Sequence, residues 1–273
     1  MRKINKIIAK SEALPSGAGG LFDLTDKTAL VTGSSSGMGK AIAMALAQHG
    51  AEVIISSFDI QELENTQIEF QNMGVEVQTI ACDMSQKAEI DQLIEACFSK
   101  YSKIDILVNC IGMAPVGGFL EISSDSFENT MNLNIQAAIH ISQLVIPKMQ
   151  AQKDGVIIYL ASIAGVRGNK NLGLYGISKA GLIEMARNLA VEFGPDNIRV
   201  NTISPGVINT PFSESLMKNE TFMAKRLSQT PLRRVGEVEE IAGVAVMLAS
   251  KAGGFITGQN IIVDGGTTIS DGN

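Results

Sequence analysis

The sequence predicts an α/β fold: a doubly wound sheet of about seven parallel strands with helices on both faces, formed as a single domain. Short runs rich in valine, isoleucine and leucine alternate with longer segments of helical periodicity along the chain. The apolar runs are nearly continuous, which is typical of strands that are buried on both faces. A glycine-rich turn directly follows the first run, where such a strand would lead into a helix.

The expected elements alternate along the chain from residue 28 onward. Strands are predicted at 28–32, 52–56, 76–80, 105–109, 156–161, 198–204 and 260–264. Helices are predicted at 38–49, 60–73, 86–101, 125–151, 175–194 and 237–250. Because crossovers between parallel strands are right-handed, successive units of this kind place helices on both faces of one sheet.

One catalytic domain is expected over residues 23–273, since no repeat or linker interrupts the alternation after residue 23. Residues 1–22 are predicted to form a mobile arm, because 11–20 are small, polar and rich in helix breakers. Docking of this arm on a partner subunit is the alternative. Residues 207–235, rich in methionine and phenylalanine between two Thr-Pro pairs, are predicted to leave the sheet and form a substrate lid.

The composition argues against several classes of protein. A net charge of −6 opposes nucleic-acid binding through a broad basic face. The two histidines and three cysteines form no cluster, so no metal site is expected. No apolar run reaches the roughly 18–20 residues that cross a membrane, and the N-terminus lacks the apolar core of a secretory signal. Cys82, Cys97 and Cys110 fit buried thiols of a reducing compartment, so a cytoplasmic protein is expected.

The glycine-rich turn has the features of a phosphate cradle. Backbone N–H groups and the positive end of a helix dipole are free at such a strand-to-helix turn to bind a pyrophosphate. Gly33 permits the tight turn, Gly37 lets the ligand approach the backbone, and Gly39 allows close packing of helix and strand. A turn required only for packing is the alternative. The predicted cofactor contacts here are Gly33, Ser35, Ser36, Gly37, Met38 and Gly39.

Two further strand ends add candidate cofactor contacts. Asp83, followed by Met84, comes after the third strand, where its carboxylate can accept a hydrogen bond from an adenine amino group. Capping of the next helix is the alternative for Asp83. Asn109 and Gly112 end the fourth strand, where a flat cofactor requires close approach to the backbone.

A catalytic group is predicted around Tyr175 and Lys179, which share one helix face because they are four residues apart. A lysine ammonium near a phenol lowers the tyrosine pKa and makes the phenol an acid/base near neutral pH. Ser162 ends the fifth strand and can hold the substrate oxygen that Tyr175 protonates. Asn134 can bridge to Lys179 through water, although a satisfied buried amide is the alternative.

These motifs together resemble the single-domain branch of the short-chain dehydrogenase/reductase family, over about residues 24–268. The resemblance implies a Rossmann-type sheet, a homotetramer and an NAD(P)-dependent oxidoreductase that interconverts an alcohol and a carbonyl compound. It implies Tyr175 as acid/base, Ser162 on the carbonyl oxygen, Lys179 on the nicotinamide ribose and Asn134 in a proton relay. The residues implied to hold the carboxamide end are Pro205, Gly206, Ile208 and Thr210.

The sequence departs from the family pattern at two places. The family's Asn-Asn-Ala-Gly turn is Asn109-Cys110-Ile111-Gly112 in this chain, which changes the cofactor contacts there. At the end of the second strand, Ser57 takes the position of the acid that selects NAD, and Phe58 that of the arginine that selects NADP. NAD or NADP therefore remains open, with a slight preference for NAD because no cation is present.

The predicted activity is hydride transfer between a nicotinamide and a small alcohol or carbonyl substrate. A catalytically silent dinucleotide-sensing protein on the same fold is the alternative, motivated by the Cys110-Ile111 turn and the N-terminal arm. An epimerase or dehydratase is disfavoured, since those relatives need a larger C-terminal substrate domain. Sugars, polyols, steroids, β-ketoacyl thioesters and small carbonyl compounds all remain possible substrates.

Overall fold

A computed structural model describes residues 20–270, and its centre is one seven-stranded parallel sheet. The strand order is β3-β2-β1-β4-β5-β6-β7. The strands are β1 (Thr28–Thr32), β2 (Glu52–Ser57), β3 (Val77–Ala81), β4 (Ile106–Asn109), β5 (Gly155–Leu160), β6 (Ile198–Pro205) and β7 (Asn260–Val263). The helices are α1 (Gly37–Gln48), α2 (Ile60–Asn72), α3 (Lys87–Lys100), α4 (Ser124–Met131), α5 (Ala137–Gln152), α6 (Gly173–Phe193), α7 (Glu214–Met217), α8 (Glu220–Ser228) and α9 (Val238–Ala249).

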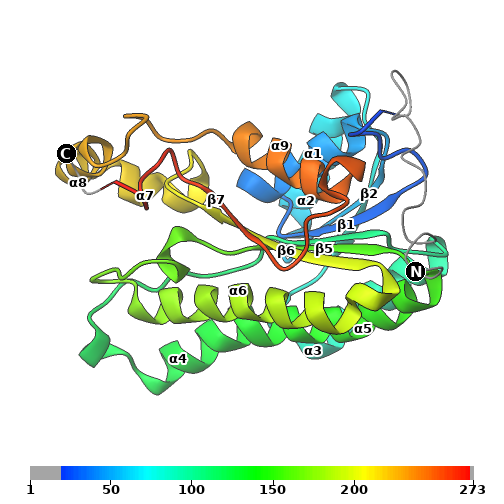
Figure 1. Ribbon diagram of the computed structural model, residues 1–273, viewed down its shortest axis with the longest axis horizontal. Helices are drawn as coiled ribbons and strands as arrows, with labels where there is room; N and C mark the ends of the chain where they lie inside the picture. Colours follow the sequence, from blue (N-terminus) through cyan, green and yellow to red (C-terminus); the bar gives the residue numbers. More distant parts are fainter. Residues whose placement is uncertain (1–19, 271–273) are drawn as a thin grey trace, which may run out of the picture.

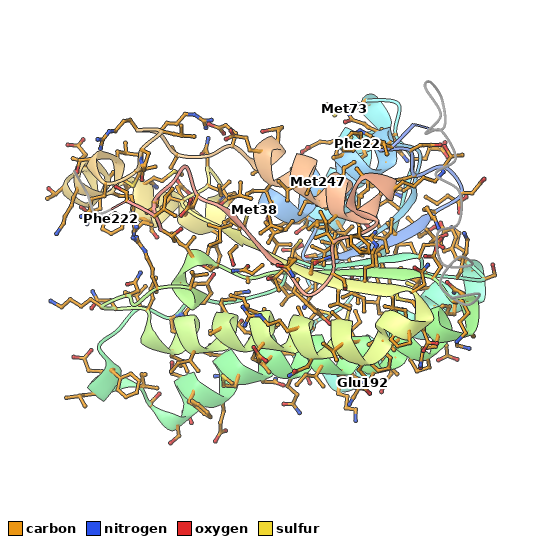
Figure 2. The ribbon with its side chains drawn as sticks, in the orientation of Figure 1. Phe22, Met38, Met73, Glu192, Phe222 and Met247 are labelled. Carbon is orange, nitrogen blue, oxygen red and sulfur yellow. The ribbon has the colours of Figure 1, made fainter. Side chains whose placement is uncertain are left out.

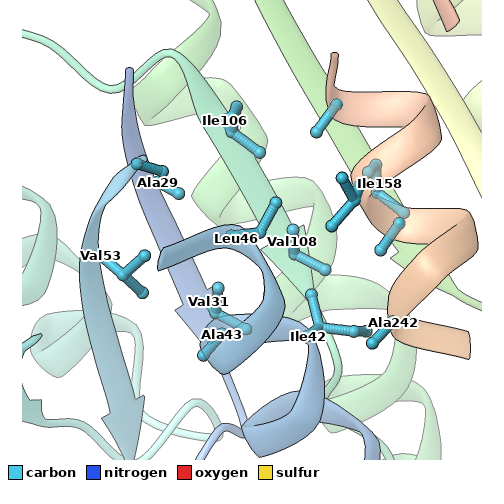
Figure 3. Packing of buried hydrophobic residues seen from close by; sticks show 14 of the residues in the cluster. Ala29, Val31, Ile42, Ala43, Leu46, Val53, Ile106, Val108, Ile158 and Ala242 are labelled. Carbon is cyan, nitrogen blue, oxygen red and sulfur yellow. The ribbon is translucent and has the colours of Figure 1, made fainter. Parts of the chain in front are cut away.

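Helices cover both faces of the sheet, as Figure 1 shows. On one face α1, α2 and α9 pack over a core that includes Ile42, Leu46 and Ile241, all fully buried. Figure 3 shows α1 and α9 meeting the strand side chains Val31, Val108 and Ile158 in this layer. On the other face α3, α5 and α6 bury a second apolar cluster against the same strands. The sheet is therefore shielded on both sides, as its continuous apolar strands require.

The order of the strands reverses between β1 and β4, which are neighbours in the sheet although they are not consecutive in the chain. Chain crossovers leave β1 and β4 in opposite directions at this switch point, so a crevice opens beyond the carboxyl ends of the strands. The glycine turn after β1 and the Asn109–Gly112 turn after β4 both lie at this edge. The topology thus brings the predicted cofactor contacts together.

The predicted doubly wound α/β fold is confirmed, and each predicted strand matches an observed one to within a residue at either end. The predicted helix 125–151 is different. It consists of α4, a π-helical turn at Asn132–Gln136 and α5. Helical periodicity in the sequence does not reveal such a turn, which widens the helix by one residue and often occurs at functional sites.

The predicted arm lies largely outside the described residues, since only 20–22 of its residues are described. These three belong to the ordered start of the fold: the amide of Asp23 donates to the carbonyl of Gly20, and that of Ala252 to Leu21 (3.1 and 3.0 Å). Between residues 20 and 270, no helix is long and apolar enough to cross a bilayer.

Candidate active site

A cavity at the carboxyl edge of the sheet joins the glycine turn to the predicted catalytic helix. It collects residues from the ends of β1, β4 and β5, from α6 and from the segment after β6. Its lining is Gly33, Ser36, Gly37, Met38, Gly39, Cys110, Ile111, Gly112, Leu160, Ala161, Tyr175, Lys179, Thr210, Pro211 and Phe212. Seven residues that the sequence predicts as cofactor contacts therefore share one cavity with both members of the Tyr-Lys pair.

The glycines of the turn are required by its geometry. Gly33 and Gly37 have φ of +66° and +54°, values that side-chain-bearing residues rarely adopt. A Cβ atom on Gly39 would lie 2.0 Å from the carbonyl oxygen of Gly33. The start of α1 consequently packs directly on the end of β1, which no other residue type permits.

The start of α1 fits a pyrophosphate. Ser36 precedes the helix in extended conformation, and its side chain makes no capping hydrogen bond; the first turn of α1 contains no acidic residue. The amide groups at this end are left without side-chain partners, and the helix dipole favours an anion there. Both the dipole and the free amides therefore suit the phosphates of a dinucleotide.

The ribose end of the predicted cofactor site contains a carboxylate that the sequence prediction missed. The hydroxyl of Ser35 lies 3.0 Å from that of Ser57 and donates to the carboxylate of Glu62 (2.8 Å). Phe58 is 76% exposed beside them. Asp59 caps α2, accepting hydrogen bonds from the amides of Gln61 and Glu62. This cap places Glu62 in the first turn of α2, facing the glycine turn.

Other predicted cofactor residues have structural partners of their own. The Asp83 carboxylate accepts from the amide of Ser85 (2.9 Å), while Gln86 occupies the cap position of α3, so Asp83 does not cap that helix. The Met84 side chain is buried in the core, which leaves its backbone for a ligand. Asn109 is buried and accepts a hydrogen bond from the hydroxyl of Thr32 (2.7 Å), tying the ends of β1 and β4 together.

The segment after β6 carries the residues implied to hold the carboxamide end. The amide of Gly206 donates to the carbonyl of Val263 (2.9 Å), and a Cβ atom on Gly206 would lie 2.9 Å from the Cα of Asp264. Pro205 ends β6, and Ile208 is buried. Thr210 lines the cavity with its chain neighbours Pro211 and Phe212. Among these implied residues, Thr210 alone lines the cavity directly.

The catalytic candidates converge at the start of α6. Ser162 follows β5, and its hydroxyl accepts from the amide of Ala164 (3.1 Å). A hydrogen bond with Ser162 lowers the pKa of Tyr175, but burial outweighs it, so that pKa lies above its usual value. The expected lowering of the Tyr175 pKa by Lys179 is therefore not what the structure gives, because burial is the larger influence. The Lys179 Nζ lies 5.7 Å from the centre of the Tyr175 ring.

Lys179 is held by backbone carbonyl groups. Its ammonium donates to the carbonyl oxygens of Leu160 (2.7 Å) and Ile111 (3.4 Å), and the side chain is 3% exposed. Burial lowers the pKa of Lys179 to about 8, while Cys110 raises it. Burial raises the pKa of the Cys110 thiol to about 12, with Lys179 lowering it. Around neutral pH the site thus holds an ammonium beside a protonated phenol and a protonated thiol.

Asn134 occupies the π-helical turn and is fully hydrogen-bonded. Its amide nitrogen donates to the carbonyl of Met113 and to the hydroxyl of Ser178 (both 2.9 Å), and its oxygen accepts from the amide of Met113 (2.8 Å). The satisfied buried amide is therefore what the structure contains. A Cβ atom on Gly112 would lie 2.9 Å from Lys179 Nζ and 3.3 Å from Asn134 Oδ1, so both groups flank Gly112.

The segment 207–235 stands at the same end of the molecule as the cavity. It contains a 3-10 turn, α7 and α8, and none of residues 211–229 is fully buried. Figure 2 shows Phe222 of this segment far along the molecule from Phe22 and Met73. Phe212 contributes to the cavity but remains 61% exposed. Arg234, near the end of this segment, pairs with both oxygens of Glu240 (2.7 and 2.6 Å).

The fold and this cavity define a dinucleotide-binding oxidoreductase. Comparison with known proteins agrees: a family model described as enoyl-(acyl carrier protein) reductase matches residues 33–268. A tropinone reductase homologue of Arabidopsis thaliana is 38% identical over 250 residues, which cover 91% of this chain and 81% of that relative. The chain belongs to the short-chain dehydrogenase/reductase family.

Solved structures of the family carry both nicotinamide cofactors. A gluconate 5-dehydrogenase from Burkholderia cenocepacia, in complex with NADP and tartrate, superposes with a TM-score of 0.88 at 27% identity, covering 92% of this chain and 98% of that one. A 7α-hydroxysteroid dehydrogenase, complexed with NADH and 7-oxo glycochenodeoxycholic acid, superposes with a TM-score of 0.86 at 35% identity. The match covers 90% of this chain and 96% of that one. This chain is accordingly an NAD(P)-dependent oxidoreductase.

Proposed function

We propose that the enzyme interconverts a secondary alcohol and a ketone or aldehyde, with Tyr175 as the acid/base. The observation that carries the proposal is the single cavity that the glycine turn shares with Tyr175 and Lys179. A buried ammonium beside a phenol, at the end of a phosphate-binding turn, suits proton transfer to an oxygen whose carbon receives hydride.

The residues of the chain have separate tasks in this proposal. Gly33, Gly37 and the start of α1 hold the pyrophosphate, and Lys179 faces the ribose of the nicotinamide. The bound nicotinamide supplies hydride to the carbonyl carbon, or removes it from the alcohol. Ser162 donates a hydrogen bond to the substrate oxygen, and Tyr175 gives that oxygen its proton during reduction. Lys179 then stabilises the phenolate until solvent reprotonates it.

Asn134 acts as a positioning residue in this account. Its side chain fixes the Met113 backbone and Ser178 to one another across two segments. Ser178 precedes Lys179 directly, so the network holds the lysine side of the cavity in place. A water-mediated proton relay from Asn134 to Lys179 stays a prediction, as does the homotetramer implied by the family.

The test of the proposed function has two stages. Fluorescence titration with NADH and with NADPH first measures cofactor binding, and a panel of ketones, aldehydes and alcohols then measures turnover. Reduction or oxidation of panel members, coupled to the nicotinamide absorbance, is the expected result. Tight cofactor binding without turnover on any member would instead favour the dinucleotide-sensing alternative, which rests on Cys110 and Ile111 lining the cavity.

The pH profile of carbonyl reduction should show an alkaline limb. Lys179 is protonated below its pKa of about 8 and loses its charge above it, so phenolate stabilisation fades as pH rises. Because kcat/KM reports free-enzyme ionisations, we expect it to fall above about pH 8. Cys110 and Tyr175 ionise at higher pH, since burial raises both pKa values. A profile that stays level to pH 10 would show that the Lys179 charge is not required.

We also propose that NAD is preferred over NADP, and that Glu62 supplies the selecting carboxylate in place of Ser57. Glu62 bonds to Ser35, which contacts Ser57, so its charge lies where a 2′-phosphate would approach. Lys40, the nearest basic residue after the glycine turn, is paired with Glu69. Phe58 offers no charge in the position of the NADP-selecting arginine.

Replacing Glu62 with glutamine should therefore improve NADPH binding while leaving NADH binding nearly unchanged. Removal of one like charge is expected to lower the Kd of NADPH by about tenfold, equivalent to about 1.4 kcal/mol. Glu64→Gln is the matched control. Glu64 is exposed on the same helix, and because it follows Glu62 by two residues it lies on a different face. An equal change for both cofactors, or the same change in the control, would contradict the assignment.

A further inference from the structure

Arg167 and Arg226, like Arg233, have no acidic partner among residues 20–270. Arg167 lies in the loop between β5 and α6, and its guanidinium donates to the carbonyl of Thr267 (3.2 Å). Arg226 lies in α8, with its Cζ 5.4 Å from the centre of the Phe222 ring. Neither arginine forms an ion pair within the described chain, whereas Arg187 and Arg234 do.

Arg226 carries an unsatisfied group. Its Nη1 atom is covered from solvent and has no hydrogen-bond partner in the described part of the protein. Burial lowers the pKa of Arg226, and the positive charge of Arg167 lowers it further. A buried donor without a partner is costly, and a second cation nearby adds repulsion. A bound anion would remove both costs.

The acidic groups close to Arg226 are already engaged. Arg226, Arg234, Glu240 and Asp264 line one cavity at the base of the lid. Glu240 is bound to Arg234 through both of its oxygens. The Asp264 carboxylate accepts from the amides of Gly266 (2.8 Å) and Thr268 (2.7 Å). Neither carboxylate is free to neutralise Arg226 without losing hydrogen bonds that it already makes.

Arg226 lines a cavity separate from that of Tyr175 and Lys179, and the link between the pair and the reacting centre runs through the chain. Arg167 follows Ser162 by five residues, on the loop that leads into the start of α6, where Tyr175 lies. Thr267, which binds Arg167 through its carbonyl, is joined to Thr230 at the lid base through their hydroxyls (2.9 Å). In Figure 1, α7, α8 and the start of α6 occupy the same end of the molecule.

We propose that Arg167 and Arg226 form an oxyanion site that binds a carboxylate of the substrate, so that the enzyme acts on hydroxy or oxo acids. The inference rests on the proposed alcohol/carbonyl chemistry and names its substrate class. Guanidinium groups suit this task because their planar donors match the two oxygens of a carboxylate. A phosphate group shares this chemistry, so the test separates the two.

The first test measures kcat/KM with NADH for matched pairs of carbonyl compounds: acetoacetate and levulinate against their methyl esters. The wild type should favour the acids. Arg226→Gln and Arg167→Gln should each lower kcat/KM for the acids by roughly 10-fold to 100-fold, the loss expected for a charged hydrogen bond, and leave the esters nearly unchanged. Arg187→Gln, an exposed arginine paired with Glu184 on α6, is the matched control.

The second test measures binding without turnover. Calorimetric titration of the NADH-bound protein with succinate, and separately with inorganic phosphate, should detect binding that Arg226→Gln abolishes. Binding of succinate supports the carboxylate site, and binding of phosphate alone moves the assignment to a phosphorylated substrate, which overturns the acid proposal. This measurement also separates the two proposals, because it remains informative if no carbonyl compound is reduced.

Other outcomes would overturn the inference. If the wild-type enzyme reduces the esters as efficiently as the acids, the two arginines do not form a carboxylate site for the substrate. Equal losses for acid and ester in both variants would indicate that the arginines only support the lid. Failure of the wild-type protein to bind either anion would show that the pair is a structural feature of the lid base.

Discussion

Replacing Tyr175 with phenylalanine should reduce turnover by a factor of about 10³, within the roughly 10²- to 10⁴-fold range of general acid–base catalysis. The substitution removes only the phenol oxygen and keeps the ring that packs beside Lys179. The proton that the substrate oxygen needs then has no donor at the correct place. Turnover is measured through nicotinamide absorbance with the best substrate of the panel.

Cofactor binding distinguishes loss of chemistry from loss of structure. We expect the Kd of NADH to stay within about threefold in Tyr175→Phe, since the glycine turn and Lys179 keep their partners. Tyr159→Phe is a matched control for the same deletion. Tyr159 is fully buried in the core with its hydroxyl 2.6 Å from that of Ser142, so its loss should cost about 1 kcal/mol of stability and no catalysis.

Retained turnover in Tyr175→Phe would rule out the phenol as the acid/base and would direct attention to Ser162 or to a water held by Lys179. Loss of turnover together with loss of NADH binding would instead mean that the ring helps to form the cofactor cavity. Because Tyr175 itself lines that cavity, the two readouts must be taken on the same sample.

The fold was predictable because its signals are local. Each strand is a continuous apolar run, and the turn after β1 contains glycines whose positive φ and close packing admit few other residues. Tyr175 and Lys179 were predictable for a similar reason, since four residues along a helix fix their relation. Their pKa values were not predictable, because burial dominates both values and no local pattern in the sequence encodes burial.

The residues that sequence analysis missed act through contacts distant in the chain. Glu62 had a weak signal: it is the third residue of a helix that Asp59 caps, a position from which acids commonly reach back to the cap. Here it reaches Ser35, from the turn after another strand. Ser178 and Arg226 had no signal in the sequence. The role of Ser178 depends on Asn134 in the π-helical turn, and that of Arg226 depends on Arg167.

Replacement of Gly39 by alanine should destabilise the protein more than the same replacement at any other helix glycine between residues 20 and 270. An alanine Cβ there would meet the Gly33 carbonyl oxygen at 2.0 Å and its carbon at 2.8 Å, both backbone atoms that cannot rotate away. We expect Gly39→Ala to lower the free energy of unfolding by about 2–4 kcal/mol through forced separation of α1 from β1. NADH binding should weaken as well, because Gly33 is displaced.

Gly243→Ala is the matched control, since Gly243 is exposed in α9 and an added Cβ meets no atom within 4 Å. Alanine is the better helix former, so this variant should gain up to about 1 kcal/mol. Thermal and urea unfolding of both variants, with and without NADH, measure these changes. The two substitutions add the same methyl group to a helix, so opposite signs isolate the contact with Gly33. A Gly39→Ala protein as stable as the wild type would mean that α1 can move away from β1 freely, and the turn would then not be the rigid phosphate cradle that hydride transfer requires.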